Sequence, residues 1–127
     1  MRMASPFERF AKQRTVLLTS YRRDGAGIGT PVNIAVEGDR AFVRTFDSAW
    51  KLKRIRNNPL VEIAPSTNTG KATGTSLRSR ARILTGDEAA RASRAIDKKY
   101  PVLHGIVVPL IHRMRGNTTV HFELTPA

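Results

Sequence analysis

The sequence contains no cysteine, so disulfide bonds, thiolate zinc sites and cysteine nucleophiles are all excluded. Its three histidines are scattered along the chain, which disfavours a structural metal site. Long apolar runs are also missing, because the longest, Ile106 to Ile111, is far shorter than the roughly 20 residues of a membrane-spanning helix. The first ten residues are charged and amphipathic and do not resemble a signal peptide. We therefore expect a cytoplasmic protein with no membrane partner and no metal.

Acidic residues are scarce: ten Asp and Glu stand against 22 Lys and Arg, which gives a formal net charge of +12 at pH 7. Such an excess suits a polyanionic partner, whether nucleic acid, acidic lipid or an anionic cofactor. A GC-rich coding sequence also produces many arginines, so the charge alone assigns no function. Aromatic residues are few as well, and no basic stripe with interleaved aromatics for stacking bases is present. A nucleic-acid-binding module is therefore the less favoured reading.

Alternation of apolar and polar residues with a period of two, bounded by turn residues, predicts six short strands in one domain spanning residues 1–127. The expected ranges are 15–21, 28–36, 40–46, 60–64, 76–84 and 120–124. Glycine-containing turns after the first two strands make the first three an antiparallel meander. The pattern predicts a small β-barrel with helices at its ends.

Two patterns of the capping-box type, Ser5 to Glu8 and Thr85 to Glu88, predict helix N-termini. The first helix is expected over residues 6–13 and the second over 86–100, where Pro101 stops it. The residues expected to be buried are Phe7, Phe10 and Ala11 in the first helix and Ala89, Ala92, Ala95 and Ile96 in the second. Residues 102–115 are amphipathic and are expected to be mostly helical.

The stretch from Arg44 to Pro59 contains five cations and one anion, and it reads as a strand running into a helix that ends at Asn58-Pro59. Asp47 or Ser48 can cap this helix. A helix N-terminus presents unpaired N–H groups and a partial positive charge, and Lys51 lies in the first turn with the hydroxyls of Thr45 and Ser48 just upstream. This combination predicts a phosphate site. The alternative is that the cations form a solvated helix face.

The fifth expected strand places Arg78, Arg80 and Arg82 on one face, and no carboxylate lies on that strand. Three arginines in a row repel one another by a few tenths of a kcal/mol per pair, so an anion is expected to offset them. In the alternative interpretation they face water or pair with acids on a neighbouring strand.

The chain resembles the flavin/deazaflavin oxidoreductase superfamily, the split-barrel proteins related to pyridoxamine 5′-phosphate oxidase, and above all the branch that uses the deazaflavin F420. The segments that carry the resemblance are residues 29–33, 43–46, 51–59, 61–66 and 113–126. Together they span nearly the whole chain. The lysine- and arginine-rich helix ending in Asn57-Asn58-Pro59 is the most specific of them.

The resemblance implies a mainly β fold with some α, a split β-barrel of about six antiparallel strands with flanking helices. It also implies a homodimer with two cofactor sites along the subunit interface. The implied phosphate ligands are Thr45, Ser48, Lys51, Lys53 and Arg54. The implied contacts along the ring system are Pro31, Val32 and Asn33, and Ala64, Pro65 and Ser66 would line the same crevice.

F420 carries a phosphodiester and an oligoglutamate tail, whereas FMN has one phosphate as its only strong anion. Arg78, Arg80 and Arg82, with Lys71, are expected to meet the tail, which favours F420 and keeps FMN as the alternative. The expected function is hydride transfer between F420 and an unidentified small molecule, carried by the cofactor without a catalytic dyad. An F420 carrier without turnover stays open. Pyridoxamine phosphate oxidase activity itself is not expected, because the extended C-terminal arginine segment of those enzymes is not found.

Overall fold

The computed structural model describes residues 5–46, 49–100 and 119–127. Within these ranges the chain forms six strands, two α-helices and one 3₁₀ turn. In chain order they are η1 (Glu8–Phe10), β1 (Val16–Tyr21), β2 (Gly27–Glu37), β3 (Arg40–Phe46), α1 (Ala49–Asn57), β4 (Leu60–Pro65), β5 (Leu77–Leu84), α2 (Gly86–Lys99) and β6 (Thr119–Pro126).

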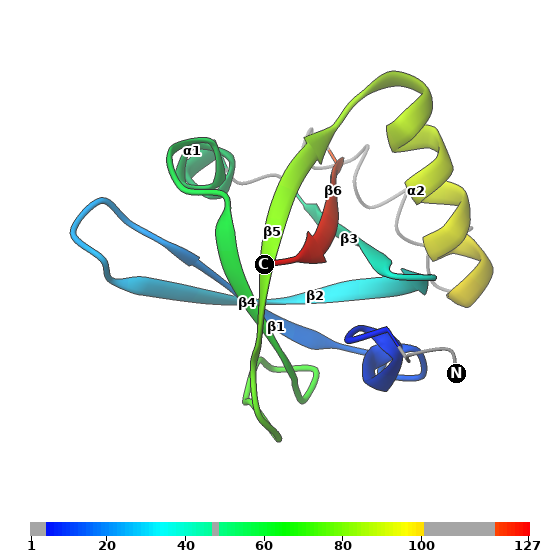
Figure 1. Cartoon of the computed structure of the whole chain (residues 1–127), viewed down its shortest axis with the longest axis horizontal. Helices are drawn as coiled ribbons and strands as arrows, with labels where there is room; N and C mark the ends of the chain where they lie inside the picture. The colour runs from blue at the N-terminus through cyan, green and yellow to red at the C-terminus, as the bar shows by residue number, and fades with distance from the viewer. Residues whose placement is uncertain (1–4, 47–48, 101–118) are drawn as a thin grey trace.

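The strands close into an antiparallel barrel in the order β1-β2-β3-β6-β5-β4 (Figure 1). The first strand, β1, pairs with β2 on one side and with β4 on the other, which completes the closure. The last strand, β6, is inserted between β3 and β5, so that Phe122 lies opposite both Val43 and Ile83. The predicted six-stranded barrel is confirmed, and each expected strand is present to within two residues at either end.

The barrel interior is filled by the inward-facing residues of the strands, because side chains alternate between the two faces of a strand. Val16, Leu18, Ile34, Val43 and Phe122 are among the buried members of this core. Phe10 of η1 and Phe7, the residue before this turn, add to the core near the start of β1. At the other end of β1, the α1 residues Leu52 and Ile55 pack against the same core. The barrel therefore has a short helical element over each end.

Helix α2 packs on the outside of the barrel over β2, β3 and β6 (Figure 1). Its Ala92 and Ile96 form a second buried cluster with Ala35 and Phe42, which point away from the barrel interior. At the end of the helix, Lys99 Nζ donates to Gln13 O at 2.6 Å and to Ile34 O at 2.8 Å, and Tyr100 Oη donates to Arg14 O at 2.7 Å. Burial lowers the pKa of Lys99 to about 8. These bonds fasten α2 to the start of β1 and to β2.

Two local predictions need correction. The expected helix over residues 6–13 is only the three-residue turn η1. Phe7 and Phe10 are buried as expected, but Ala11 is exposed, because the chain must turn at once to enter β1. Helix α2 begins where expected, yet Thr85 makes no side-chain capping bond. The carboxylate of Glu88 is instead drawn to Arg82, which removes the acidic half of the predicted capping box.

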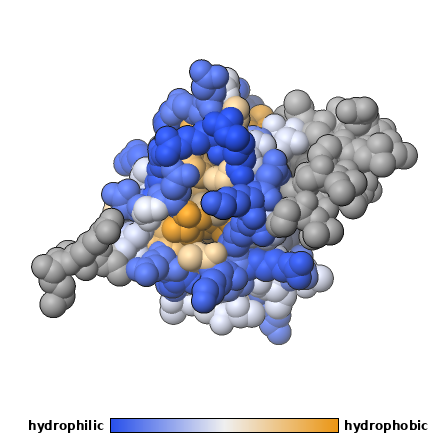
Figure 2. All heavy atoms as spheres, turned by 90° about the vertical axis from the view of Figure 1, so that its right-hand side faces the viewer, coloured by the Kyte–Doolittle hydropathy of each residue, from blue (hydrophilic) through white to orange (hydrophobic). Residues whose placement is uncertain are grey.

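The face that lies on the right of Figure 1, where α2 and η1 are, is dominated by hydrophilic residues around a small apolar hollow (Figure 2). Among the described residues, no helix is long and apolar enough to cross a membrane. The predicted helical segment 102–115 lies outside the described residues.

Candidate functional site

A cavity of about 470 Å³ lies where α1 meets the tip of the β1–β2 hairpin. We call it the α1 cavity. Its lining residues are Tyr21, Arg22, Arg23, Ile28, Lys53, Arg54 and Asn57. Four of these are cations and none of the described lining residues is an acid. The volume falls within the range of small-molecule sites, and the lining favours an anionic ligand.

The α1 side of the cavity follows from the helical repeat. Asn57 follows Lys53 by four residues and Arg54 by three, the two spacings that make side chains neighbours on a helix surface, while Ile55 is buried in the barrel core. Arg54 Nε also donates to the hydroxyl of Ser20 at 2.8 Å, and Ser20 is a buried residue, the last but one of β1. This bond fixes the guanidinium between the barrel and the cavity.

The hairpin side of the cavity is formed by a tight turn. Arg22 N donates to Ala26 O at 2.9 Å, and Gly25 N donates to Arg22 O at 2.9 Å. Gly25 has φ +89°, a conformation that a residue with a side chain rarely adopts, so glycine is required there. Arg22 also approaches Asp24 at 3.6 Å, but both side chains are more than half exposed and the pair contributes little. The turn thus places Arg22 and Arg23 at the cavity.

Lys53 and Arg54, which the family resemblance implied as cofactor ligands, both line the α1 cavity. Arg22 and Arg23 were not predicted as site residues. Their position at the cavity depends on α1 lying beside the hairpin, which local pattern does not reveal. The one available signal was two adjacent cations at a hairpin tip.

The other predicted phosphate ligands lie elsewhere or are not described. Thr45 is buried at the end of β3, opposite Val120 of β6. Lys51 belongs to the first turn of α1 by its backbone, and its side chain lies outside the description. Ser48 lies outside the described residues. The roles of Thr45, Ser48 and Lys51 therefore stay predictions.

The predicted ring-contact residues lie on β2 and at the end of β4, the two strands that flank β1. Leu17 of β1 lies opposite Pro31 of β2 on one side and opposite Ala64 of β4 on the other. A carbon added at Gly70 would lie only 3.3 Å from Pro31 Cδ, so the loop after β4 passes close to this row. The remaining members differ in exposure: Val32 and Ser66 are buried, whereas Asn33 and Pro65 are half-buried.

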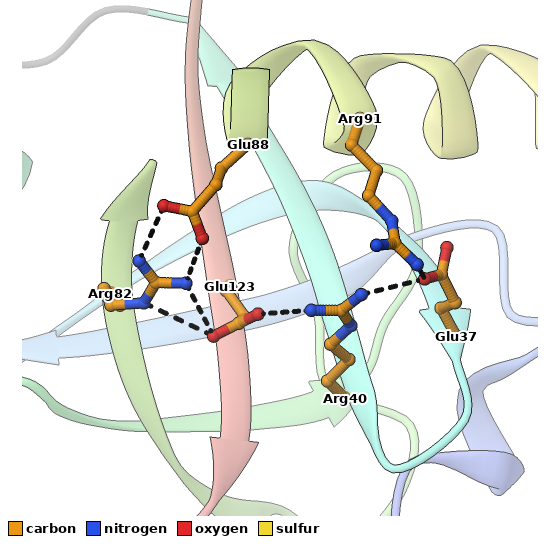
Figure 3. A network of polar contacts seen from close by, with 6 residues as sticks. All are labelled: Glu37, Arg40, Arg82, Glu88, Arg91 and Glu123. Carbon is orange, nitrogen blue, oxygen red and sulfur yellow. Dashed lines mark hydrogen bonds and ion pairs between the residues drawn. The ribbon is translucent and has the colours of Figure 1, made fainter. Parts of the chain in front are cut away.

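The three arginines of β5 are exposed on one face, as predicted. Arg82 forms a two-pronged ion pair with Glu88, at 3.1 and 2.6 Å, and contacts Glu123 at 3.2 Å (Figure 3). Glu123 in turn accepts from Arg40 at 3.0 Å. Arg40 and Arg91 both bind Glu37, which extends the network to six residues (Figure 3). The alternative interpretation, pairing to acids on a neighbouring strand, therefore describes Arg82.

These ion pairs shift the titration of their members. Hydrogen bonds from Arg82 hold the pKa of Glu88 below its usual range, and those from Arg40 and Arg91 do the same for Glu37. The side chains of Glu37 and Glu88 are 39% and 59% exposed, so water screens much of this effect. Glu123 is the buried member, with a side chain only 11% exposed. The network joins α2 to the outer face of the barrel.

Beneath α2, the buried Arg44 donates from Nε to His121 Nε2 at 3.2 Å and from Nη2 to Ser93 Oγ at 2.9 Å, and it pairs with Asp97 at 2.9 Å. Burial and the nearby Arg44 charge lower the pKa of His121 to about 4. His121 is therefore neutral at pH 7 and accepts a hydrogen bond, a structural role. His104 and His112 lie outside the described residues. No group of three or more potential metal ligands occurs among the residues that the structure describes.

No family model matches the sequence, and no curated protein does either. Solved structures do match. HutZ, the heme storage protein from Vibrio cholerae, has a TM-score of 0.65 at 14% identity, covering 98% of this chain and 92% of that one. An FAD-binding protein from Mesorhizobium loti gives 0.62 at 16% identity, with 92% and 82% covered. A candidate pyridoxamine 5′-phosphate oxidase from Listeria innocua gives 0.59 at 16% identity, with 91% and 85% covered.

These similarities define the class of fold. The chain is a split β-barrel of the type found in pyridoxamine 5′-phosphate oxidase-like proteins. Proteins of this fold include flavin-binding and heme-storing members, so the fold by itself does not select a ligand.

Proposed function

We propose that the chain binds a phosphate-bearing deazaflavin or flavin in the α1 cavity and uses it for hydride transfer, with F420 as the cofactor and FMN as the alternative. The observation that carries this proposal is the convergence of Arg22, Arg23, Lys53 and Arg54 on one cavity of cofactor-compatible size. Because these cations come from two separate elements, their common position is not a by-product of one charged helix face.

The donor set fits the phosphate group of either cofactor. Arg22, Arg23 and Arg54 offer planar guanidinium groups that pair with phosphate oxygens in a two-pronged geometry, and Lys53 offers a flexible ammonium. Four cations exceed what the single phosphate of FMN requires, which supports the more anionic F420. Ile28 and Tyr21 supply apolar surface in the same cavity.

When bound, the cofactor would supply the hydride chemistry, and the protein would supply position and electrostatics. We propose that Lys53 and the hairpin arginines bind the phosphate, and that the hydrogen bond from Arg54 to Ser20 holds the Arg54 side chain in position beside it. Pro31, Val32, Asn33, Ala64, Pro65 and Ser66 are proposed to contact the ring system. Arg78, Arg80 and Arg82 remain proposed contacts for the tail, although Arg82 is already paired. We also propose a cytoplasmic homodimer and a small-molecule substrate.

Fluorescence titration with F420 and with FMN tests the proposal. We expect F420 to bind with a Kd well below about 100 µM, which corresponds to roughly −5.5 kcal/mol. A protein that is yellow when purified and binds FMN more tightly than F420 would select the alternative cofactor. Absence of binding by both cofactors would refute the proposal. A substrate screen with reduced F420 then separates an enzyme from a carrier, because only an enzyme reoxidises it.

A further inference from the structure

The first half of β2 has a neighbouring strand on one side only. It pairs with β1 over residues 27–32, whereas its pairing with β3, through which the barrel closes, covers residues 33–37. The hairpin of β1 and β2 projects from the barrel at the left of Figure 1. Among the strands that the structure describes, none pairs with residues 27–32 on the side away from β1. We call this stretch the β2 edge.

The hydrogen-bonding pattern determines which backbone groups lie along the β2 edge. Arg22 N donates to Ala26 O at 2.9 Å, so these two residues form a hydrogen-bonded pair at the end of the hairpin. Hydrogen-bonded and non-hydrogen-bonded pairs alternate along an antiparallel ladder, so Ile28 and every second residue after it bond to β1. The N–H and C=O groups of Gly27 and Gly29 therefore point away from β1, along the β2 edge.

The residue types along the β2 edge fit this arrangement. Pro31 has no N–H, and proline is tolerated in a strand where its nitrogen faces no partner strand. Gly29 has no Cβ, and a Cβ added there would lie 3.0 Å from Leu17 Cδ1 of β1, which already occupies the space beside it. Gly27, Gly29 and Pro31 are all exposed. The β2 edge thus offers two N–H donors and three carbonyl acceptors to an extended chain.

Cations lie at both ends of the β2 edge. Arg22 and Arg23 are exposed in the turn that precedes it. At the other end, the loop after β4 passes close to Pro31, and the exposed Lys71 belongs to that loop. The acid of the hairpin turn, Asp24, is more than half exposed and pairs only loosely with Arg22, at 3.6 Å. The surroundings of the edge therefore favour an acidic partner.

We propose that the β2 edge binds an extended acidic segment of a partner protein, which adds to the sheet as a further strand. The backbone of the segment bonds to Gly27 and Gly29, and its carboxylates pair with the cations at the two ends. A second copy of this chain is the poorer occupant, because each copy has a net charge of +12 and the two sets of cations would repel each other. Pro31 and the hairpin arginines also belong to the proposed cofactor site, so the tests use cofactor-free protein and vary only Gly29.

Amide hydrogen exchange, measured by NMR with a capped hexapeptide of alternating glutamate and valine, tests the proposal directly. At saturation we expect the peptide to slow exchange of the Gly27 and Gly29 N–H groups about tenfold or more, and to leave that of Gly38, in the turn after β2, unchanged. A peptide with lysine in place of glutamate should not bind. No slowing at up to about 10 mM acidic peptide would overturn the proposal. So would exchange in the free protein that slows as protein concentration rises, because a second copy would then cover the edge.

Gly29→Pro and Gly29→Ala form a matched pair, because both add a Cβ beside Leu17 but only proline removes the N–H. We expect Gly29→Pro to bind the acidic peptide about tenfold more weakly than Gly29→Ala. N-methylated peptides test the same bonds in the wild type and decide the question alone if the proline variant does not fold. Only every second peptide N–H faces the edge, so of two peptides methylated at alternate positions, one should lose binding and the other keep it. Equal binding by the two variants, or of the two methylated peptides, would reduce the interaction to diffuse charge and overturn the proposal.

Discussion

Replacement of Lys53 by alanine gives the sharpest test of the α1 cavity. The side chain is exposed and lines the cavity beside Arg54 and Asn57. A hydrogen bond between a charged donor and a phosphate contributes roughly 1.5 to 3 kcal/mol. Lys53→Ala should therefore weaken binding of F420, or of FMN, about tenfold to a hundredfold, by the rule of 1.4 kcal/mol per decade.

Fold stability should change little in the same variant. Alanine is the best helix former, and the change removes one cation from a chain of net charge +12. We expect the free energy of unfolding to shift by less than about 0.5 kcal/mol in a urea titration. A large loss of stability would mean that Lys53 supports the fold rather than a ligand.

Lys98→Ala is the matched control for this experiment. Lys98 is an exposed lysine in the last turn of α2 and does not line the cavity. The Lys98→Ala substitution lowers the net charge of the protein by the same single positive charge as Lys53→Ala. The fluorescence titrations are run at about 0.15 M salt, because this salt concentration screens electrostatic interactions over distances beyond roughly 8 Å. Equal losses of affinity in Lys53→Ala and Lys98→Ala would refute a localised phosphate site and leave only a diffuse positive field.

Three further variants test other parts of the account. Arg54→Ala should lower cofactor affinity, and in a urea titration it should lower the free energy of unfolding by about 1 kcal/mol, because the buried Ser20 hydroxyl loses its hydrogen-bond donor. A loss of affinity without a loss of stability would contradict the anchoring role of Arg54. Glu123→Gln should cost about 1 to 3 kcal/mol of unfolding free energy, since Arg40 and Arg82 lose a shared buried charge, whereas the exposed Glu8→Gln should cost nothing measurable. Because the pKa of His121 falls from 6.5 to about 4 on folding, the unfolded chain takes up the proton first as the pH drops through this window. Stability should then fall by up to about 3 kcal/mol between pH 6.5 and 4, and His121→Gln should flatten that part of the profile.

Local periodicity was sufficient to predict the strands. The strand predicted over residues 40–46 has those bounds in the structure, because alternating residues are bounded there by a glycine turn and by a break in the pattern. The antiparallel order β1-β2-β3 was predicted from the turns between these strands and is confirmed, but the position of β6 was not predictable in the same way. Placing β6 between β3 and β5 joins residues far apart in sequence, and this placement gives Arg82 its partner Glu123. The charge pattern of β5 alone does not predict that Arg82 pairs with Glu123.

The candidate site also combines residues that the sequence pointed to with residues that only the packing of separate elements brings together. The basic helix is a local feature of the sequence, but Lys53 and Arg54 were predicted as ligands only through the family resemblance, and the structure adds that Asn57 lines the same cavity. Arg22 and Arg23 were missed because only the packing of α1 beside the hairpin brings them to the same cavity as Lys53 and Arg54. The capping-box prediction at Thr85 failed for a related reason, since Glu88 finds a cation on β5 that outcompetes the helix end.

A crystal structure of the protein with bound F420, or with FMN if that binds more tightly, tests the central claim most directly. The account predicts that the cofactor phosphate lies in the α1 cavity, within hydrogen-bonding distance of Lys53 and of at least one of Arg22, Arg23 and Arg54. A phosphate bound instead along the exposed β5 face at Arg80, or at any site without Lys53, would contradict it.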